Sequence, residues 1–316
     1  MAVLRDIGSH CLRALAVAAL IATVLVGSPG RAPAEENGRP LAMALMASES
    51  QHEIEARWSP LLQDLGRRLG TSVVADIHAD YSRAVWGLRS GQDQLAWLGN
   101  EAAIKAVDHA GAEVFAQQSL SSAGGDYFSC LVVNADSPFH SAEEVIDRAA
   151  GLTLARGDAN STSGTVIPDY YLFARRGTDA GHLFRRLVQG THEANIFAVA
   201  EGRADAATIS SRILDMVRRD HPETAARVRV VWRSPVIPGN PLLWRKDLPE
   251  AVKTSIRAFF VDYGKATPGK SPARLAEEQA NLDRLGFFGF AASDDRQLLP
   301  VRRVEVGLKL EPAPPP

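Results

Sequence analysis

The chain has 316 residues, enough for about two domains, and 46% hydrophobic and 23% charged residues are ordinary values for a globular protein. This composition excludes a disordered, collagen-like or disulfide-scaffold chain. The formal net charge is −2, so no basic excess is available to neutralise a nucleic-acid backbone. We therefore expect no nucleic-acid partner.

Residues 1–34 have the pattern of a secretory signal peptide. Arg5 and Arg13 lie before or at the start of an apolar run over residues 15–26, and the small residues at 32–34 fit a cleavage site. A membrane anchor is the alternative, but the run is shorter than the roughly 20 residues that span a bilayer. The sequence predicts a protein that is exported to the periplasm and is soluble after cleavage.

The predicted mature chain keeps one cysteine. Cys130 lies in the apolar run SCLVVN, whereas Cys11 precedes the hydrophobic part of the signal and would be removed with it. One cysteine cannot form an internal disulfide, and a cysteine in an apolar run is usually a small buried hydrophobe. We predict that Cys130 is buried and unpaired.

Strand-like and helix-like apolar patterns alternate along the chain. Strands are predicted at 41–46, 72–77, 94–98, 131–133, 152–154 and 228–232, and helices at 58–69, 82–88 and 213–218. Pro60 is expected in the first turns of its helix, where its missing N–H costs least, and Gly70 at the end. The alternation predicts an α/β fold with parallel sheets covered by helices on both faces. The tail at 311–316, EPAPPP, is predicted to be disordered.

The sequence lacks several common catalytic and cofactor motifs. It contains no GxGxxG, HExxH or GxSxG pattern, and no two of its eight His have metal-ligand spacing. We therefore predict no metal and no cofactor. An exported α/β protein of this kind is expected to capture a small molecule.

One segment indicates an anion. Ser161, Thr162 and Ser163 follow a predicted strand and precede a helical pattern. The first N–H groups of a helix have no internal partner and lie at the positive end of its dipole, and three hydroxyls add further donors. The segment predicts either a site for a tetrahedral oxyanion or an ordinary helix start capped by Asn160, Ser161 or Thr162.

The stretch GDANSTSGTVIPDYYLFA resembles the phosphonate-binding periplasmic proteins of ABC importers. The resemblance covers nearly all of residues 41–302 in the same order, through ASESQHEIEARWSPLLQDL, DYSRAVWGLRSG, AWLGNEAAIKAVD, GTHEAN, GRADAAT and SPVIPGNPLLWRKDLPE. It implies a type II-like periplasmic binding protein fold, in which two α/β lobes joined by two crossover hinge strands enclose a ligand cleft. Lobe 1 would comprise 35–133 and 235–310, and lobe 2 would comprise 134–234, with hinges near 132–135 and 232–235.

The resemblance also implies a set of ligand-binding residues. Those expected to hold the oxyanion are Tyr81, Tyr127, Ser161, Thr162, Ser163 and His192. Hydroxyls, phenols and an imidazole can all donate hydrogen bonds to phosphonate oxygens. His192 is further expected to change its protonation with the second ionisation of the ligand.

Two positions depart from the family members that bind 2-aminoethylphosphonate, which hold the ligand's ammonium with two acids. The aligned residues here are Arg212 and Asn240. A nearby cation repels an ammonium, so the resemblance predicts a neutral or anionic substituent on the phosphorus. The alternative is that Arg212 turns away and pairs with Asp215. The family's C-terminal dimerisation tail is missing, and we expect a monomer.

The sequence therefore predicts a non-enzymatic solute-binding protein that captures a phosphonate by hinge closure and delivers it to an ABC permease in the inner membrane. A phosphate or phosphite binding protein is the alternative within this class. A periplasmic phosphoester hydrolase would use Ser161 or Ser163 as nucleophile and His192 as base, but the sequence offers no evident third group to orient the base. A sensory partner of a membrane receptor kinase is a third possibility.

Overall fold

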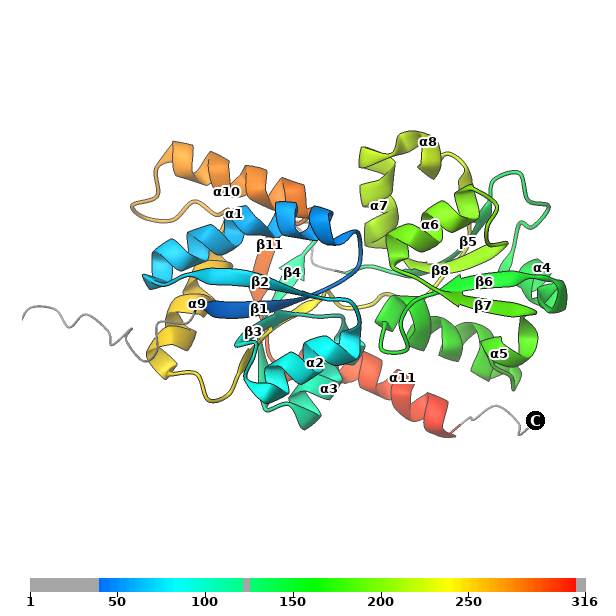
Figure 1. Cartoon of the computed structure of the whole chain (residues 1–316), viewed down its shortest axis with the longest axis horizontal. Coiled ribbons are helices and arrows are strands. Elements are labelled where there is room, and N and C mark those ends of the chain that lie inside the picture. Colours follow the sequence, from blue (N-terminus) through cyan, green and yellow to red (C-terminus); the bar gives the residue numbers. More distant parts are fainter. Residues whose placement is uncertain (1–39, 122–125, 311–316) are drawn as a thin grey trace, which may run out of the picture. The chain divides into compact units, whose positions relative to one another are not determined.

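The computed structural model describes residues 40–121 and 126–310, which form two mixed β-sheets with helices packed beside them (Figure 1). The predicted signal peptide at 1–34 and the predicted disordered tail at 311–316 lie outside the described residues. Within the described ranges, no helix combines the length and the apolar character needed to cross a membrane. The α/β fold predicted from the alternating patterns is confirmed.

The first sheet has six strands in the order β11-β4-β10-β3-β1-β2. These strands are β1 (Leu41–Met46), β2 (Val73–His78), β3 (Leu95–Trp97), β4 (Ala112–Ser119), β10 (Pro241–Arg245) and β11 (Gly289–Ala292). β1 pairs in parallel with β2 and β3, whereas β10 runs antiparallel to β3 and β4. The helical elements on this side of the chain are α1 (Gln51–Leu69), α2 (Tyr81–Ser90), α3 (Asn100–His109), α9 (Glu250–Asp262), α10 (Pro272–Leu285), η5 (Asp295–Leu298) and α11 (Leu299–Leu310).

The second sheet has five strands in the order β7-β6-β8-β5-β9. They are β5 (Ser129–Asn134), β6 (Thr153–Arg156), β7 (Arg186–Gln189), β8 (Ala206–Ser210) and β9 (Val228–Arg233). β6 is parallel to β7 and β8, and β5 is antiparallel to β8 and β9. The helical elements of this part are α4 (Ala142–Asp147), η1 (Ala149–Gly151), η2 (Thr162–Val166), η3 (Asp169–Phe173), η4 (Ala174–Arg176), α5 (Ala180–Leu183), α6 (His192–Ala200), α7 (Ser211–Asp220) and α8 (Pro222–Ala225).

Strand β5 shows why an unbroken apolar run forms a central strand. Cys130 and Val132 belong to the core on one face of the second sheet, and Leu131 and Val133 belong to the core on the other. Alternate residues of a strand point to opposite faces, so a strand that is covered on both sides needs apolar residues at every position. Cys130 is fully buried and unpaired, which confirms the prediction.

Two details of the predicted elements are wrong. The sheets are mixed rather than parallel, because β10 and β5 run against their neighbours. Helix α1 begins at Gln51, where the side chain of Ser50 accepts a hydrogen bond from the N–H of Glu53. This N-cap lies well upstream of the predicted start, so Pro60 is in the interior of the helix and Gly70 ends it as expected.

The chain crosses between the sheets twice, after β4 and after β9. The two crossing segments pair with each other, since Tyr127 and Ile237 exchange backbone hydrogen bonds of 3.0 and 2.8 Å. β5 pairs with β8 and β9 of the second sheet from residue 129 onward. The division into two lobes remains a prediction.

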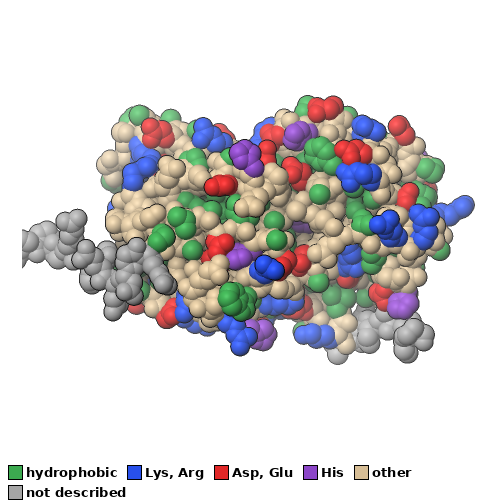
Figure 2. Space-filling model, viewed as in Figure 1, with side chains coloured by type: hydrophobic (Ala, Val, Ile, Leu, Met, Phe, Trp, Pro, Cys, Tyr) green, Lys and Arg blue, Asp and Glu red, His purple; other side chains and the backbone are tan. Residues whose placement is uncertain are grey.

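Acidic and basic side chains are interspersed over the face of the molecule drawn in Figure 2. No broad basic patch covers that face. This distribution agrees with the near-neutral net charge of the sequence.

Candidate functional site

Most of the predicted site residues follow the carboxyl ends of parallel strands. Tyr81 opens α2 after β2, and His192 opens α6 after β7. Arg212 is the second residue of α7 after β8, and the hydroxyl trio 161–163 follows β6. In open α/β sheets, ligands bind outside the carboxyl ends of the strands, because the connecting loops converge there. The topology therefore directs side chains that are distant in sequence toward one region.

One small cavity is lined by all of the predicted site residues. They are Tyr81, Tyr127, Ser161, Thr162, Ser163, His192, Arg212 and Asn240, and each is buried. The sequence reasoning missed the other lining residues, which are Met46, Ser48, Gly99, Ser210 and Ile213. The positions of Ser48 and Gly99 could have indicated them, because each lies two residues after the end of a strand, β1 or β3, that also ends in this region.

Of the two roles that the sequence left open for the hydroxyl trio, the structure shows the capping role. Ser161 caps η2, because its Oγ accepts a hydrogen bond of 3.1 Å from the N–H of Gly164. Thr162 Oγ1 accepts one of 2.9 Å from the N–H of Glu101 in α3. A hydroxyl oxygen that accepts a bond still has its hydrogen to donate. Residues 162–166 form a π turn, a wide helical turn that is frequent at functional sites.

The tautomer of His192 follows from its neighbours. The N–H of Ser210 donates to Nδ1 at 3.2 Å, so the neutral ring carries its hydrogen on Nε2, which lies 3.5 Å from Ser161 Oγ. Burial, together with the charge of Arg212, lowers the pKa of His192 to about 4. His192 is therefore a neutral N–H donor at neutral pH in the ligand-free protein, rather than a group poised to titrate there.

Both tyrosines of the cavity are neutral donors. Burial raises the pKa of Tyr81 to about 12, and it also raises the pKa of Tyr127. Each phenol therefore keeps its hydrogen at physiological pH. Together with the hydroxyl trio and His192, they give the cavity a surface of O–H and N–H groups.

Arg212 lines the cavity and does not turn away from it. Its guanidinium carbon lies 5.3 Å from the ring centroid of Trp97 and 5.7 Å from that of Phe287. Asp215 instead pairs with Arg218 at 2.7 Å. The alternative in which Arg212 pairs with Asp215 is therefore wrong, and the aromatic rings hold the cation in place.

The charge of Arg212 is only partly balanced. Within the described ranges, its one ion pair is to Glu49 Oε1 at 3.8 Å, and its one hydrogen bond is to Met216 Sδ, a weak acceptor. Glu49 also pairs with Arg57 at 3.1 Å. Of the described residues that line the cavity, none is Asp or Glu. The cavity is therefore electropositive.

Among the described residues, two polar atoms at the cavity have no hydrogen-bond partner. Ser48 Oγ and Asn240 Oδ1 are buried and unsatisfied, and both residues line the cavity. A buried polar group without a partner costs about 1–3 kcal/mol. These two atoms are therefore free to form hydrogen bonds with a polar ligand in the cavity.

Comparison with known proteins gives one consistent result. Residues 43–298 match the family model described as ABC transporter, phosphonate, periplasmic substrate-binding protein. The phosphonates-binding periplasmic protein of Escherichia coli K12 is 40% identical over 273 residues, which cover 86% of this chain and 78% of that protein.

Two solved structures share the fold. A binding protein component of an ABC phosphonate transporter from Pseudomonas aeruginosa is 37% identical with a TM-score of 0.79, and the match covers 84% of this chain and 86% of that one. PhnD1 from Prochlorococcus marinus, solved with methylphosphonate, is 19% identical with a TM-score of 0.74, covering 86% and 99%. These similarities confirm the periplasmic binding protein fold expected from the sequence.

Proposed function

Because this chain belongs to the phosphonate-binding periplasmic proteins of ABC transporters, we propose that the cavity around His192 is its ligand site. The observation that carries the proposal is the convergence of all the sequence-predicted residues on one buried cavity that no described acidic residue lines. Elements of both sheets contribute to it. A tetrahedral phosphorus oxyanion suits such a lining, because its oxygens can accept hydrogen bonds from several of the O–H and N–H donors at once.

The oxyanion end would be held by neutral donors. These are the hydroxyls of Ser161, Thr162 and Ser163, the phenols of Tyr81 and Tyr127, and Nε2–H of His192. Hydrogen bonds to an ionised acceptor are roughly twice as strong as those between neutral groups. Binding would therefore draw its energy from charge-assisted hydrogen bonds in a dry cavity, without covalent chemistry.

The substituent on phosphorus would be neutral or anionic. Arg212 supplies a fixed cation at the cavity, and Asn240 is uncharged. An ammonium about 5 Å from a guanidinium would be repelled by about 3 kcal/mol at the effective dielectric constant of partly buried groups. A carboxylate suits Arg212, because the two can form parallel hydrogen bonds. Phosphate and phosphite, which lack an organic substituent, are the alternative ligands.

Uptake would proceed by closure of the two predicted lobes around the ligand. Hydrogen bonds that join elements beside the two sheets support a closed state: Asn160 Nδ2 donates to Ser82 Oγ at 2.9 Å, and the N–H of Ser50 donates to Glu193 Oε2 at 3.2 Å. The closed protein, exported as a monomer after cleavage of residues 1–34, would then dock on an inner-membrane permease.

The geometry favours binding over phosphoester hydrolysis. A serine nucleophile needs a base with a free lone pair, but Nε2 of His192 carries a hydrogen because Nδ1 accepts from Ser210. A backbone N–H also occupies the position in which a catalytic carboxylate would orient the ring. His192 is therefore arranged as a donor.

Calorimetric titration of the ligand-free protein with methylphosphonate tests the proposal. We expect saturable one-to-one binding, and no turnover of a chromogenic phosphate ester by the same sample. Ester turnover that co-purifies with the protein and disappears in Ser161→Ala would contradict a binding role. Absence of binding for every phosphorus oxyanion would contradict the assignment of the cavity.

A further inference from the structure

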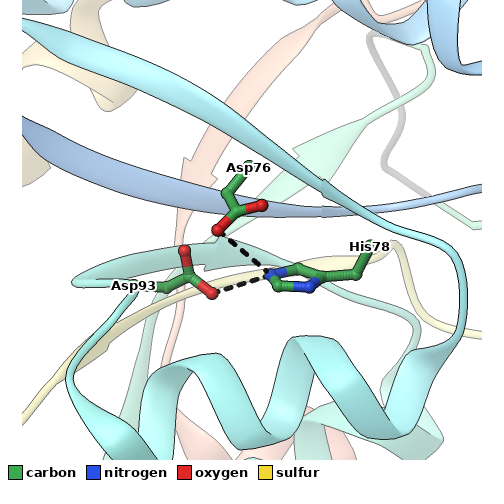
Figure 3. Close-up of side chains that lie close together, drawn as sticks. All are labelled: Asp76, His78 and Asp93. Atoms are coloured by element: carbon green, nitrogen blue, oxygen red, sulfur yellow. Dashed lines mark hydrogen bonds and ion pairs between the residues drawn. The ribbon is translucent and has the colours of Figure 1, made fainter.

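A second polar cluster lies outside the cavity, at the edge of the first sheet. Asp76 and His78 are two residues apart on β2, so their side chains share one face of the strand. Asp93 lies in the turn between α2 and β3, where its N–H donates to the carbonyl oxygen of Gly87 at 3.0 Å. Figure 3 shows both carboxylates directed at the same imidazole nitrogen.

The spacing of the three side chains suits a metal ion. Nε2 of His78 lies 2.8 Å from Asp93 Oδ2 and 3.8 Å from Asp76 Oδ2. One ligand atom from each residue lies within 4.8 Å of the other two. Two ligands that are each about 2.0 Å from a tetrahedral ion are roughly 3.3 Å apart. The observed distances lie on either side of this value, so small side-chain rotations would bring all three into coordination.

The cluster has more negative charge than its neighbours balance. Asp93 is fully buried, and no described residue donates a hydrogen bond to its Oδ1. Across residues 40–121 and 126–310, neither Asp76 nor Asp93 forms an ion pair with Lys or Arg. The two carboxyl groups interact with His78 and with each other, and Asp76 Oδ2 also accepts a hydrogen bond from Gln92 Nε2. Burying a carboxylate without full pairing is costly. A His–Asp pair alone leaves the charge of the second carboxylate unbalanced, whereas a divalent cation would balance it.

We propose that Asp76, His78 and Asp93 form a binding site for a divalent transition metal ion, and that zinc fits it best. An imidazole with two carboxylates is a ligand set that zinc accepts, with water in the remaining position. The side chain of Asp76 is 30% exposed and that of Asp93 is fully buried, so the ion would enter and keep its water on the Asp76 side.

The site would also brace the element that carries Tyr81. A Cβ atom at Gly87 of α2 would lie 1.8 Å from Asp93 Oδ2 and 3.3 Å from His78 Nε2, so the cluster packs directly against the helix backbone. Helix α2 begins at Tyr81, three residues after His78. An ion at this position would therefore join β2, α2 and the turn before β3. No spacing in the sequence predicts the three-residue cluster, because only the fold brings Asp93 to β2.

The test is titration of the chelator-treated protein with zinc chloride and, separately, with cobalt chloride in phosphate-free buffer. We expect one ion per chain by calorimetry and visible cobalt absorption bands that zinc abolishes. His78→Gln and Asp76→Asn should each weaken zinc binding by about 100-fold or more. This loss exceeds the one typical of residues that only hydrogen-bond to a metal ligand. Asp76 is the less buried ligand, which makes Asp76→Asn the safer variant for folding.

His182→Gln is the matched control. It removes another His–Asp pair, with Asp179 Oδ2 at 2.5 Å from Nδ1, that lies on the surface and lacks a third ligand. Zinc affinity should be unchanged in this variant. The proposal is overturned if the wild type binds neither ion, or if zinc binding survives both Asp76→Asn and His78→Gln. Phosphonate binding by the same samples is a separate readout, so the two proposals fail independently.

Discussion

Thr162 Oγ1 accepts a hydrogen bond of 2.9 Å from the backbone N–H of Glu101. Thr162 begins η2 beside the second sheet, and Glu101 lies in α3 beside the first, so the bond joins the two halves of the cavity wall. Because the oxygen is the acceptor, the hydroxyl hydrogen is left to donate to a ligand. One side chain can thus serve both closure and binding.

Thr162→Val removes this hydroxyl and keeps the shape of the side chain. We expect phosphonate affinity to fall by about 1.5–3 kcal/mol, roughly ten- to hundredfold, the scale of a hydrogen bond to a charged group. Thr162→Ser keeps the hydroxyl and should bind within a few-fold of the wild type. Equal calorimetric dissociation constants for Thr162→Val and the wild type would show that the residue is only structural.

His192 should make the ligand-free protein sensitive to acid. Its folded-state pKa of about 4 lies below the unfolded value of 6.5, so the unfolded chain binds the proton more readily. The contribution to stability is complete above pH 6.5 and is lost as the pH falls toward 4. Between pH 7 and 4.5 we expect this residue to account for a loss of about 2–3 kcal/mol in the free energy of unfolding.

Urea denaturation of His192→Gln at the two pH values checks this expectation. The decrease in stability should be smaller in this variant than in the wild type, whereas the exposed His140→Gln control should match the wild type. If His192→Gln and the wild type lose the same stability, the imidazole is not held neutral by burial.

Arg212 and Asn240 should set the preference for the substituent. The double change Arg212→Glu with Asn240→Asp places two acids at the cavity, and we expect its relative affinity for 2-aminoethylphosphonate over phosphonoacetate to rise at least about tenfold. Arg218→Glu, an exposed change on the same helix, is the control and should not alter the ratio. An unchanged ratio in the double variant would refute the role given to these two residues.

Cys130 should be inert in the native protein. It is fully buried, and burial raises the pKa of its thiol to about 11, so very little thiolate is present near neutral pH. Cys130→Ala should keep phosphonate affinity and reduce stability by about 1 kcal/mol through lost packing. Rapid labelling of the folded wild type by a thiol reagent at pH 8 would contradict burial.

Much of the fold could be predicted from local patterns. The run at 41–46 is β1 as expected, and α1 ends at Gly70, which has the left-handed φ of 69° that favours glycine. The start of α1 was predicted too late, because the capping signal at Ser50 precedes the apolar stripe by two turns. The direction of β5 and β10 depends on pairing with distant strands, so a local pattern carries no information about it.

The candidate site likewise has features that the sequence predicts and features that depend on contacts between distant residues. The resemblance identified residues that the structure brings to one cavity, but it could not give their states. The protonation of His192 depends on Ser210, 18 residues away in the chain, and the orientation of Arg212 depends on Trp97 and Phe287. These contacts exist only after the chain has folded. The cluster of Asp76, His78 and Asp93 was invisible in the sequence for the same reason.

Calorimetry of the wild-type protein against phosphate, phosphite, methylphosphonate, phosphonoacetate and 2-aminoethylphosphonate tests the central claim most directly. An electropositive cavity lined by Arg212 and Asn240 should bind methylphosphonate or phosphonoacetate at least about tenfold more tightly than 2-aminoethylphosphonate, since a repulsion of 1.4 kcal/mol already gives that ratio. Tighter binding of 2-aminoethylphosphonate than of every neutral or acidic ligand in the series would contradict the claim.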